Sequence, residues 1–149
     1  MIQHLVNYIG IAALATSGAV VGVRKGFDLF GIATLAVLTG IGGVVLRDML
    51  LDLAPPASIQ HWQDITVCLA AAAVTTIFAK WVIQLNQLVL VLDAVGMGFF
   101  ATSGAAISAD HGASWFAAAV LGVISAVAGS VMRDVVAREV PMVLGPDDM

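Results

Sequence analysis

The sequence predicts an all-α, polytopic membrane protein built as an inverted repeat of three-helix units. Of its 149 residues, 60% are hydrophobic and 11% are charged, whereas soluble domains carry roughly a quarter charged residues. Five apolar segments are long enough to cross a bilayer, and two ungapped blocks recur at an offset of 86 residues. The composition places the chain in a membrane, and the repeat indicates how its helices are organised.

The scarcity and the sign of the charges exclude several classes of protein. Six basic and ten acidic residues give a net charge of −4, which argues against a nucleic-acid partner, because phosphate binding needs clustered Lys and Arg. The single cysteine, Cys68, cannot form an intrachain disulfide and matches no spaced set of metal ligands. No nucleophilic triad spacing, phosphate-binding loop or dinucleotide-binding fingerprint is present. The sequence therefore predicts no enzyme, no cofactor and no metal site.

The predicted membrane segments follow one another with short connectors. A spanning helix needs about 20 mostly apolar residues, and five stretches qualify: residues 5–23, 29–46, 65–85, 88–109 and 113–132. The first lacks the basic start of a signal peptide and is too long for one. The third contains Lys80 and the fourth contains Asp93, each close enough to a helix end to reach the interface. No connector separates folded units, so we expect residues 1–149 to form a single transmembrane domain.

The basic residues orient the chain, because Lys and Arg stay preferentially in short cytoplasmic loops. With the N-terminus outside, only Arg47 is left on the outer side. The basic residues on the cytoplasmic side are then Arg24, Lys25, Lys80, Arg133 and Arg138. We therefore expect a multi-pass topology with the N-terminus outside.

The repeat aligns the first predicted helix with the fourth and the second with the fifth. Residues 14–19 and 100–105 share Ala-Thr-Ser-Gly-Ala, and residues 43–48 and 129–134 share a glycine and an Arg-Asp pair. The offset contains three predicted crossings, an odd number, so the two copies run in opposite directions through the bilayer. Inverted repeats of this kind are typical of secondary transporters and of some channels, with the site near the membrane midplane.

The two copies differ in length. Repeat 1 covers about residues 5–85, and repeat 2 covers about residues 88–149. The partner of the third segment would follow Met149, so repeat 2 is expected to be incomplete, with two of its three helices.

Glycines occupy matching places in the second and fifth predicted helices. Gly42 and Gly43 lie in the second, and Gly129 lies at the corresponding place in the fifth. Because glycine costs about 1 kcal/mol relative to alanine inside a helix, these positions are natural kinks or breaks. Functionally, they would bend both pore helices around a polar path. The alternative is close helix packing, for which small residues serve generally in membranes.

A charged pair follows the glycines in each copy, Arg47-Asp48 in one and Arg133-Asp134 in the other. A charge at the centre of a membrane helix costs roughly 2.5–3.5 kcal/mol, so it usually faces the bundle interior or an aqueous cavity. Adjacent residues point about 100° apart on a helix. We therefore expect Arg47 to pair with Asp134 and Arg133 with Asp48, or all four to line the pore mouths and set electrostatics or gating. The alternative is that both pairs are interfacial anchors that end their helices.

Polar side chains also lie inside the first and fourth predicted helices. Thr16 and Ser17 recur as Thr102 and Ser103, and their hydroxyls are candidates for the polar lining of a pore. The alternative is that each bonds a carbonyl of its own helix, which is common for Ser and Thr in membranes. Asp93 is a possible site residue that attracts cations or carries a proton, or else an interfacial cap.

Three stretches carry a resemblance to a known family. They read Thr-Gly-Ile-Gly-Gly-Val-Val-Leu-Arg-Asp at 39–48, Val-Leu-Asp-Ala-Val-Gly at 91–96 and Ala-Gly-Ser-Val-Met-Arg-Asp at 128–134. These motifs resemble those of the prokaryotic members of the trimeric intracellular cation channel family. The resemblance holds for both copies of the repeat and for the order of the motifs along the chain. Members of the same family are also described as glycine transporters, so the resemblance leaves channel and carrier open.

The resemblance implies a seven-helix subunit in a homotrimer, with a pore inside each subunit lined by kinked second and fifth helices. It implies conduction of potassium, with sodium also permeant, and a location in the cell inner membrane among its lipids. The sequence departs from that pattern by lacking the last two helices and by reading Ala128-Gly129 in place of a Gly-Gly pair. We expect a monovalent cation channel. The alternatives are a secondary carrier of a small amino acid such as glycine and a membrane scaffold without a permeation path.

Overall fold

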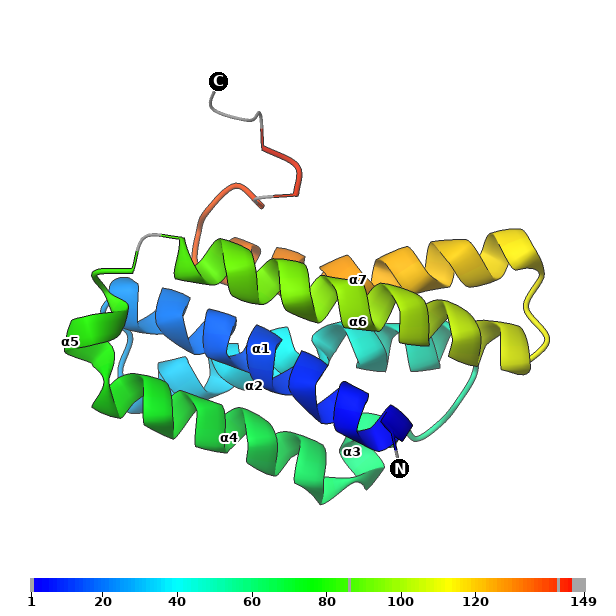
Figure 1. Ribbon diagram of the computed structural model, residues 1–149, viewed down its shortest axis with the longest axis horizontal. Helices are drawn as coiled ribbons and strands as arrows, with labels where there is room; N and C mark the ends of the chain where they lie inside the picture. The colour runs from blue at the N-terminus through cyan, green and yellow to red at the C-terminus, as the bar shows by residue number, and fades with distance from the viewer. Residues whose placement is uncertain (1, 86, 142, 146–149) are drawn as a thin grey trace.

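The computed structural model describes residues 2–85, 87–141 and 143–145, and within them every regular element is a helix. In chain order these are α1 (Ile2–Arg24), α2 (Leu29–Leu50), α3 (Ala57–Gln60), α4 (Trp62–Ile77), α5 (Ala79–Val82), α6 (Leu88–Asp110) and α7 (Trp115–Val136) (Figure 1). Helices α1, α2, α6 and α7 are each long and apolar enough to cross a membrane. The predicted all-α membrane fold is confirmed.

The third predicted segment differs from the structure. In place of one helix over 65–85, α4 ends at Ile77 after 16 residues, and the short helix α5 follows Phe78. At 1.5 Å per residue, α4 is about 24 Å long, which is shorter than the roughly 30 Å of a bilayer core. Helix α3, after Pro55 and Pro56, was not predicted.

The other helices extend beyond their predicted ends. Helix α2 continues to Leu50 and α7 continues to Val136. Both Arg-Asp pairs consequently lie within the last turns of their helices, and their role as interfacial anchors stays a prediction. Residues 146–149 of the predicted second repeat lie outside the described residues.

The turns between paired helices show the repeat in their backbone geometry. Gly26 after α1 and its repeat partner Gly112 after α6 both have positive φ, 69° and 85°, which glycine adopts without steric cost. Asp28 then caps α2 by accepting a hydrogen bond from the Gly31 amide at 2.7 Å. Its repeat partner Ser114 caps α7 in the same way, as is usual for these residue types.

The four long helices form the bundle that positions the site. Helix α1 packs against α2 and α6 against α7, while α1 also contacts α6 and α2 contacts α7; α4 lies against α1 and α2 (Figure 1). At the α1–α6 contact, Gly10 faces Phe100 and Gly96 faces Leu14. Residues 10 and 96, and 14 and 100, are repeat partners, so this contact is reciprocal. The predicted inverted repeat is confirmed.

The outer surface of the bundle is apolar. Large hydrophobic side chains are exposed along α2, α4, α6 and α7, including Phe30 and Phe116, which are repeat partners. Trp62, Trp81 and Trp115 are exposed near helix ends, where tryptophan is enriched at membrane–water interfaces. This surface has the character of one that faces lipid.

Candidate functional site

Helices α2 and α7 cross at the predicted glycines. A Cβ atom on Gly43 would overlap the carbonyl oxygen of Ser125, and one on Gly129 would overlap the carbonyl oxygen of Thr39. Residues 39 and 125, and 43 and 129, are repeat partners, so the crossing is reciprocal about the pseudo-two-fold axis. The structure therefore shows the close-packing role of these glycines directly.

Both α2 and α7 remain helical through the crossing. A Cβ atom on Gly42 would approach the Sδ atom of Met132 to 3.2 Å, so Gly42 also faces α7. The bend that the sequence predicts at these positions stays a prediction.

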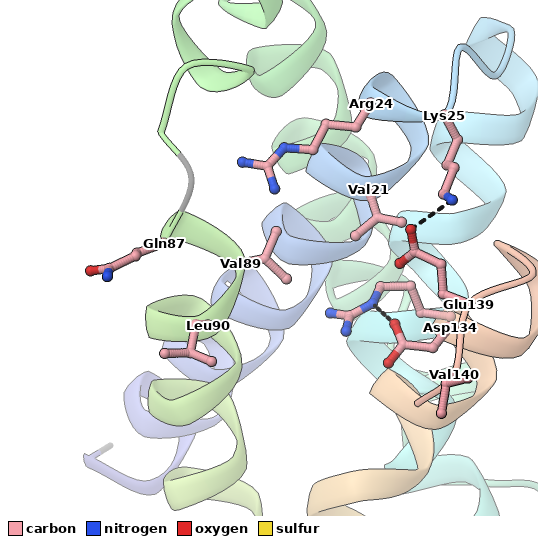
Figure 2. A pocket seen from close by; sticks show the side chains of 10 residues that line it. Val21, Arg24, Lys25, Gln87, Val89, Leu90, Asp134, Glu139 and Val140 are labelled. Atoms are coloured by element: carbon pink, nitrogen blue, oxygen red, sulfur yellow. Dashed lines mark hydrogen bonds and ion pairs between the residues drawn. The ribbon is translucent and has the colours of Figure 1, made fainter. Parts of the chain in front are cut away.

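A cavity of about 500 Å³, here called cavity 1, lies at the end of the bundle where α1 ends, α6 begins and α7 ends. Figure 2 shows its lining: Val21, Arg24, Lys25, Gln87, Val89, Leu90, Arg133, Asp134, Glu139 and Val140. At its rim, Lys25 pairs with Glu139 at 2.6 Å. Arg24 donates to the Leu85 carbonyl at 2.7 Å. The rim therefore contains both acidic and basic side chains. Their contacts connect the end of α1 to the segment before α6 and to the segment after α7.

A buried ion cluster forms one wall of cavity 1. The Arg133 guanidinium donates through Nε to Asp134 Oδ1 at 2.7 Å and through Nη1 to Asp93 Oδ1 at 2.7 Å. Nη1 also donates to the Ser17 hydroxyl, which in turn donates to Asp93 Oδ1 at 2.6 Å. Arg133 is 1% exposed, and a charge this deeply buried needs such partners to offset its desolvation. The cluster joins α1, α6 and α7.

A second cavity of about 650 Å³, cavity 2, lies at the opposite end of the bundle, where α1 and α4 begin and α2 and α6 end. Its polar lining residues are Asn7, Tyr8, Arg47, Ser58, His61, Gln63, Asp64, Thr102, Ser103 and Asp110. Arg47 donates to Asp48 Oδ1 through Nε at 2.9 Å and Nη2 at 2.5 Å. Asp48 Oδ2 accepts from the Ala57 amide at 2.9 Å, which anchors the chain just before α4.

The residues around the two buried arginines are related by the repeat but differ at one acidic position. Arg47 corresponds to Arg133, and Ser103 corresponds to Ser17. Asn7 stands in cavity 2 at the position that corresponds to Asp93. The carboxylate that closes the cluster at cavity 1 is thus an amide at cavity 2.

The predicted pairing of Arg47 with Asp134 and of Arg133 with Asp48 is wrong. Each arginine bonds the aspartate that follows it in sequence. The 100° between adjacent Cβ directions does not prevent this, because the long arginine side chain folds back along its own helix. The other prediction, that these pairs line the pore mouths, stays a prediction; Arg47 lines cavity 2, and Arg133 and Asp134 line cavity 1.

The candidate hydroxyls divide into two groups. Thr16 donates to the Ala12 carbonyl at 2.7 Å, and Thr102 donates to the Gly98 and Phe99 carbonyls at 3.1 and 3.0 Å, so both bond their own helix as the alternative predicted. Ser17 belongs to the buried cluster, and Ser103 lines cavity 2.

Asp93 is buried in the cluster and does not cap its helix. It is 4% exposed, and the residue that precedes α6 is Gln87. The interfacial-cap alternative for Asp93 is therefore wrong.

Sequence reasoning assigned no role to several residues that line cavity 2, among them Asn7, His61, Asp64 and Asp110. The repeat offset pairs Asn7 with Asp93 and Asp110 with Arg24, but it gives His61 and Asp64 no counterpart among the described residues. Across the described ranges, no group of three or more His, Cys, Asp or Glu side chains could hold a metal ion.

Comparison with known proteins places this geometry in a family. The sequence profile of a family described as "Glycine transporter" matches residues 4–80 and 90–148. The chain belongs to this family. Its relatives include a UPF0126 membrane protein of Deinococcus radiodurans, 35% identical over 141 residues, and the UPF0126 inner membrane protein YadS of Escherichia coli K12, 34% identical over 145 residues. These alignments include 95% and 97% of this chain. They include only 66% and 70% of the length of the two relatives.

Solved structures extend the family assignment to the fold. The chain is similar to the TRIC trimeric intracellular cation channel orthologue from Rhodobacter sphaeroides, with a TM-score of 0.93 and 32% identity over 98% of this chain and 75% of that one. It is also similar to a prokaryotic TRIC channel, with a TM-score of 0.92 and 35% identity over 97% of this chain and 74% of that one. The resemblance inferred from the sequence is confirmed under both of its names.

Proposed function

We propose that this member of the glycine transporter family is a monovalent cation channel with a pore inside each subunit, conducting potassium and also sodium. The observation that carries the proposal is the pair of cavities at opposite ends of one bundle, separated by the α2–α7 glycine crossing. Each cavity has a buried Arg-Asp pair at its inner end. The similar solved structures are of TRIC cation channels, which are not enzymes, in agreement with the sequence prediction.

Charge favours cations over anions at cavity 2, which Asp64 and Asp110 line beside Arg47, whereas cavity 1 has the basic residues Arg24, Lys25 and Arg133 beside Asp134 and Glu139. Each buried arginine is bonded to a carboxylate, Arg47 to Asp48 and Arg133 to both Asp93 and Asp134. Further carboxylates line the cavities, and rings of Asp or Glu favour cations in pores. The scaffold alternative is disfavoured, because it requires arginines at the headgroups, whereas both arginines are buried beside cavities.

The proposed assembly rests on the same comparison, and the proposed orientation rests on the positions of the basic residues. One of the similar structures is of a trimeric intracellular cation channel, so the functional unit we propose is a homotrimer in the cell inner membrane. With the N-terminus outside, cavity 1 opens toward the cytoplasm and cavity 2 toward the outer side. The exposed apolar surface then contacts lipid, apart from the area taken by subunit contacts.

Single-channel recording of the purified protein in a planar bilayer tests the proposal. We expect ohmic potassium currents that vanish in a Gly43→Leu variant, because the side chain would enter the crossing at the Ser125 backbone. Gly98→Ala is the matched control, since nothing lies within 4 Å of a Cβ at that glycine, and its currents should equal those of the unmodified protein. The absence of potassium current at any voltage would refute a channel.

A carrier of a small amino acid such as glycine is the second candidate. The family description favours it, and each cavity contains both a guanidinium and carboxylates, the two groups that a zwitterion binds. It predicts saturable uptake of labelled glycine into proteoliposomes without bulk potassium conductance. Potassium conductance without glycine uptake would exclude it.

A further inference from the structure

Two buried side-chain oxygens lack a hydrogen-bond partner among the residues that the structure describes. They are Asp93 Oδ2 and Ser125 Oγ, in side chains that are 4% and 0% exposed. Buried polar groups in native proteins are nearly always hydrogen-bonded, and one without a protein partner normally binds a water or an ion. These two oxygen atoms are therefore candidates for contact with a solute that moves between the two cavities.

Ser125 lies at the α2–α7 crossing, in contact with residues whose chain neighbours line cavity 2. It stands on α7 between two glycines: its carbonyl faces Gly43 of α2, and its Cβ and Oγ lie 2.8 and 3.1 Å from the position of a Cβ on Gly104 of α6. The chain neighbours of these glycines, Val44 and Ser103, both line cavity 2. The Ser125 side chain thus packs against α6 near that cavity, at the level of the α2–α7 crossing.

Other buried hydroxyls in the bundle behave differently. Thr39, the repeat partner of Ser125, donates to the Leu35 carbonyl at 2.6 Å. Ser108 donates to the Gly104 carbonyl at 2.7 Å, and Ser130 donates to the Val127 carbonyl at 2.9 Å. Each of these satisfies its hydroxyl within its own helix, which is the usual arrangement in membranes. The Ser125 oxygen does not, so it is available to a ligand.

Asp93 belongs to the ion cluster beside cavity 1. Its Oδ1 holds Ser17 and Arg133, while its Oδ2 has no described partner. Val89 and Leu90, one turn earlier on α6, line cavity 1 together with Arg133. One orphan oxygen therefore lies at the glycine crossing, and the other lies in the ion cluster beside cavity 1.

We propose that Ser125 Oγ coordinates the permeant cation at the crossing and helps set its selectivity, with Asp93 Oδ2 as the second oxygen on the route. This inference rests on the proposed channel function. A neutral hydroxyl replaces part of the hydration shell of a monovalent cation without binding it too tightly to leave, as conduction requires. The hydroxyls predicted from the sequence, Thr16 and Thr102, are not needed for this step.

The first test compares Ser125→Ala with Ser108→Ala in the full chain, in planar bilayers. Both variants remove one buried hydroxyl, but only the first removes an oxygen from the route. Loss of a hydroxyl–cation contact should lower the potassium conductance of Ser125→Ala about tenfold and change its potassium-to-sodium permeability ratio. Ser108→Ala should match the unmodified protein in both. Equal conductance and equal permeability ratio in the two variants would overturn the inference.

The second test places a thiol on the route and does not depend on the alanine variant folding. In a Cys68→Ala background, Ser125→Cys should be blocked by silver ions, because a monovalent soft cation that enters the path binds the thiolate. Ser108→Cys in the same background should remain open. If silver leaves the conductance of Ser125→Cys unchanged, the proposed role of Ser125 is contradicted. The proposed channel function is not affected by that result. A protein that conducts no cation removes both proposals.

Discussion

The glycine crossing gives a sharp prediction for stability. Gly43 and Gly98 lie in long helices of similar character, yet their surroundings differ completely. A Cβ on Gly43 meets the backbone carbonyl of Ser125, which cannot rotate away, whereas a Cβ on Gly98 meets nothing within 4 Å. Replacing each glycine with alanine therefore adds the same methyl group to the tightest and to the most open environment in the bundle.

The expected magnitudes have opposite signs. Overpacking at Gly43 should cost about 1–3 kcal/mol, because α2 and α7 must separate to admit the methyl group. Gly98→Ala should gain about 1 kcal/mol from helix propensity. The two variants should thus differ by about 2–4 kcal/mol in the free energy of unfolding. Gly129→Ala, which meets the Thr39 carbonyl, should resemble Gly43→Ala.

Thermal unfolding in one detergent at one scan rate measures the difference. For a chain of this size, 1 kcal/mol shifts the midpoint by roughly 2–4 °C, so the two alanine variants should melt about 4–16 °C apart. The order should be Gly98→Ala above the unmodified protein and Gly43→Ala below it. Equal midpoints for Gly43→Ala and Gly98→Ala would refute the close crossing of α2 and α7.

Further predictions concern single contacts, each measured by denaturation in the same detergent. Arg133→Leu removes the arginine that binds two buried carboxylates and should lower the free energy of unfolding by about 3–5 kcal/mol. Lys25→Gln breaks a half-exposed ion pair and should lower it by less than about 1 kcal/mol. Equal losses in the two variants would contradict the burial of the cluster. Gly26→Ala places a Cβ at a φ of 69° and should cost about 1–2 kcal/mol; an unchanged midpoint would show that the turn relaxes. Asp28→Ala removes a helix cap and should cost about 1 kcal/mol, most of which Asp28→Asn should retain; equal loss in both would exclude capping.

The architecture could be predicted because it depends on patterns that the sequence carries directly. Apolar length identified the four long helices, and the offset of 86 residues predicted their antiparallel pairing into two copies. The same offset identified Gly43 and Gly129 as counterparts, and the structure brings them together at one crossing. Such periodic signals determine which face of a helix is buried and which helix it meets.

The details of the site depend on side-chain conformation, which periodicity does not specify. The direction of a Cβ atom suggested that Arg47 could not reach Asp48, but the flexible arginine stem allows it. The break after Ile77 follows no Gly or Pro, so hydropathy alone extended that helix. Ser125 is indistinguishable in sequence from Ser108, because only packing against Gly104 and Gly43 decides which hydroxyl lacks a partner.

The reversal potential of the purified protein in a planar bilayer tests the central claim most directly. Under a tenfold gradient of potassium chloride, a cation-selective pore should reverse close to the potassium equilibrium potential, about 59 mV from zero. When sodium replaces potassium on one side of this gradient, the current at zero voltage should keep the sign that it had with potassium on both sides. A reversal potential of the opposite sign, which indicates chloride, or no current at any voltage, would contradict the account.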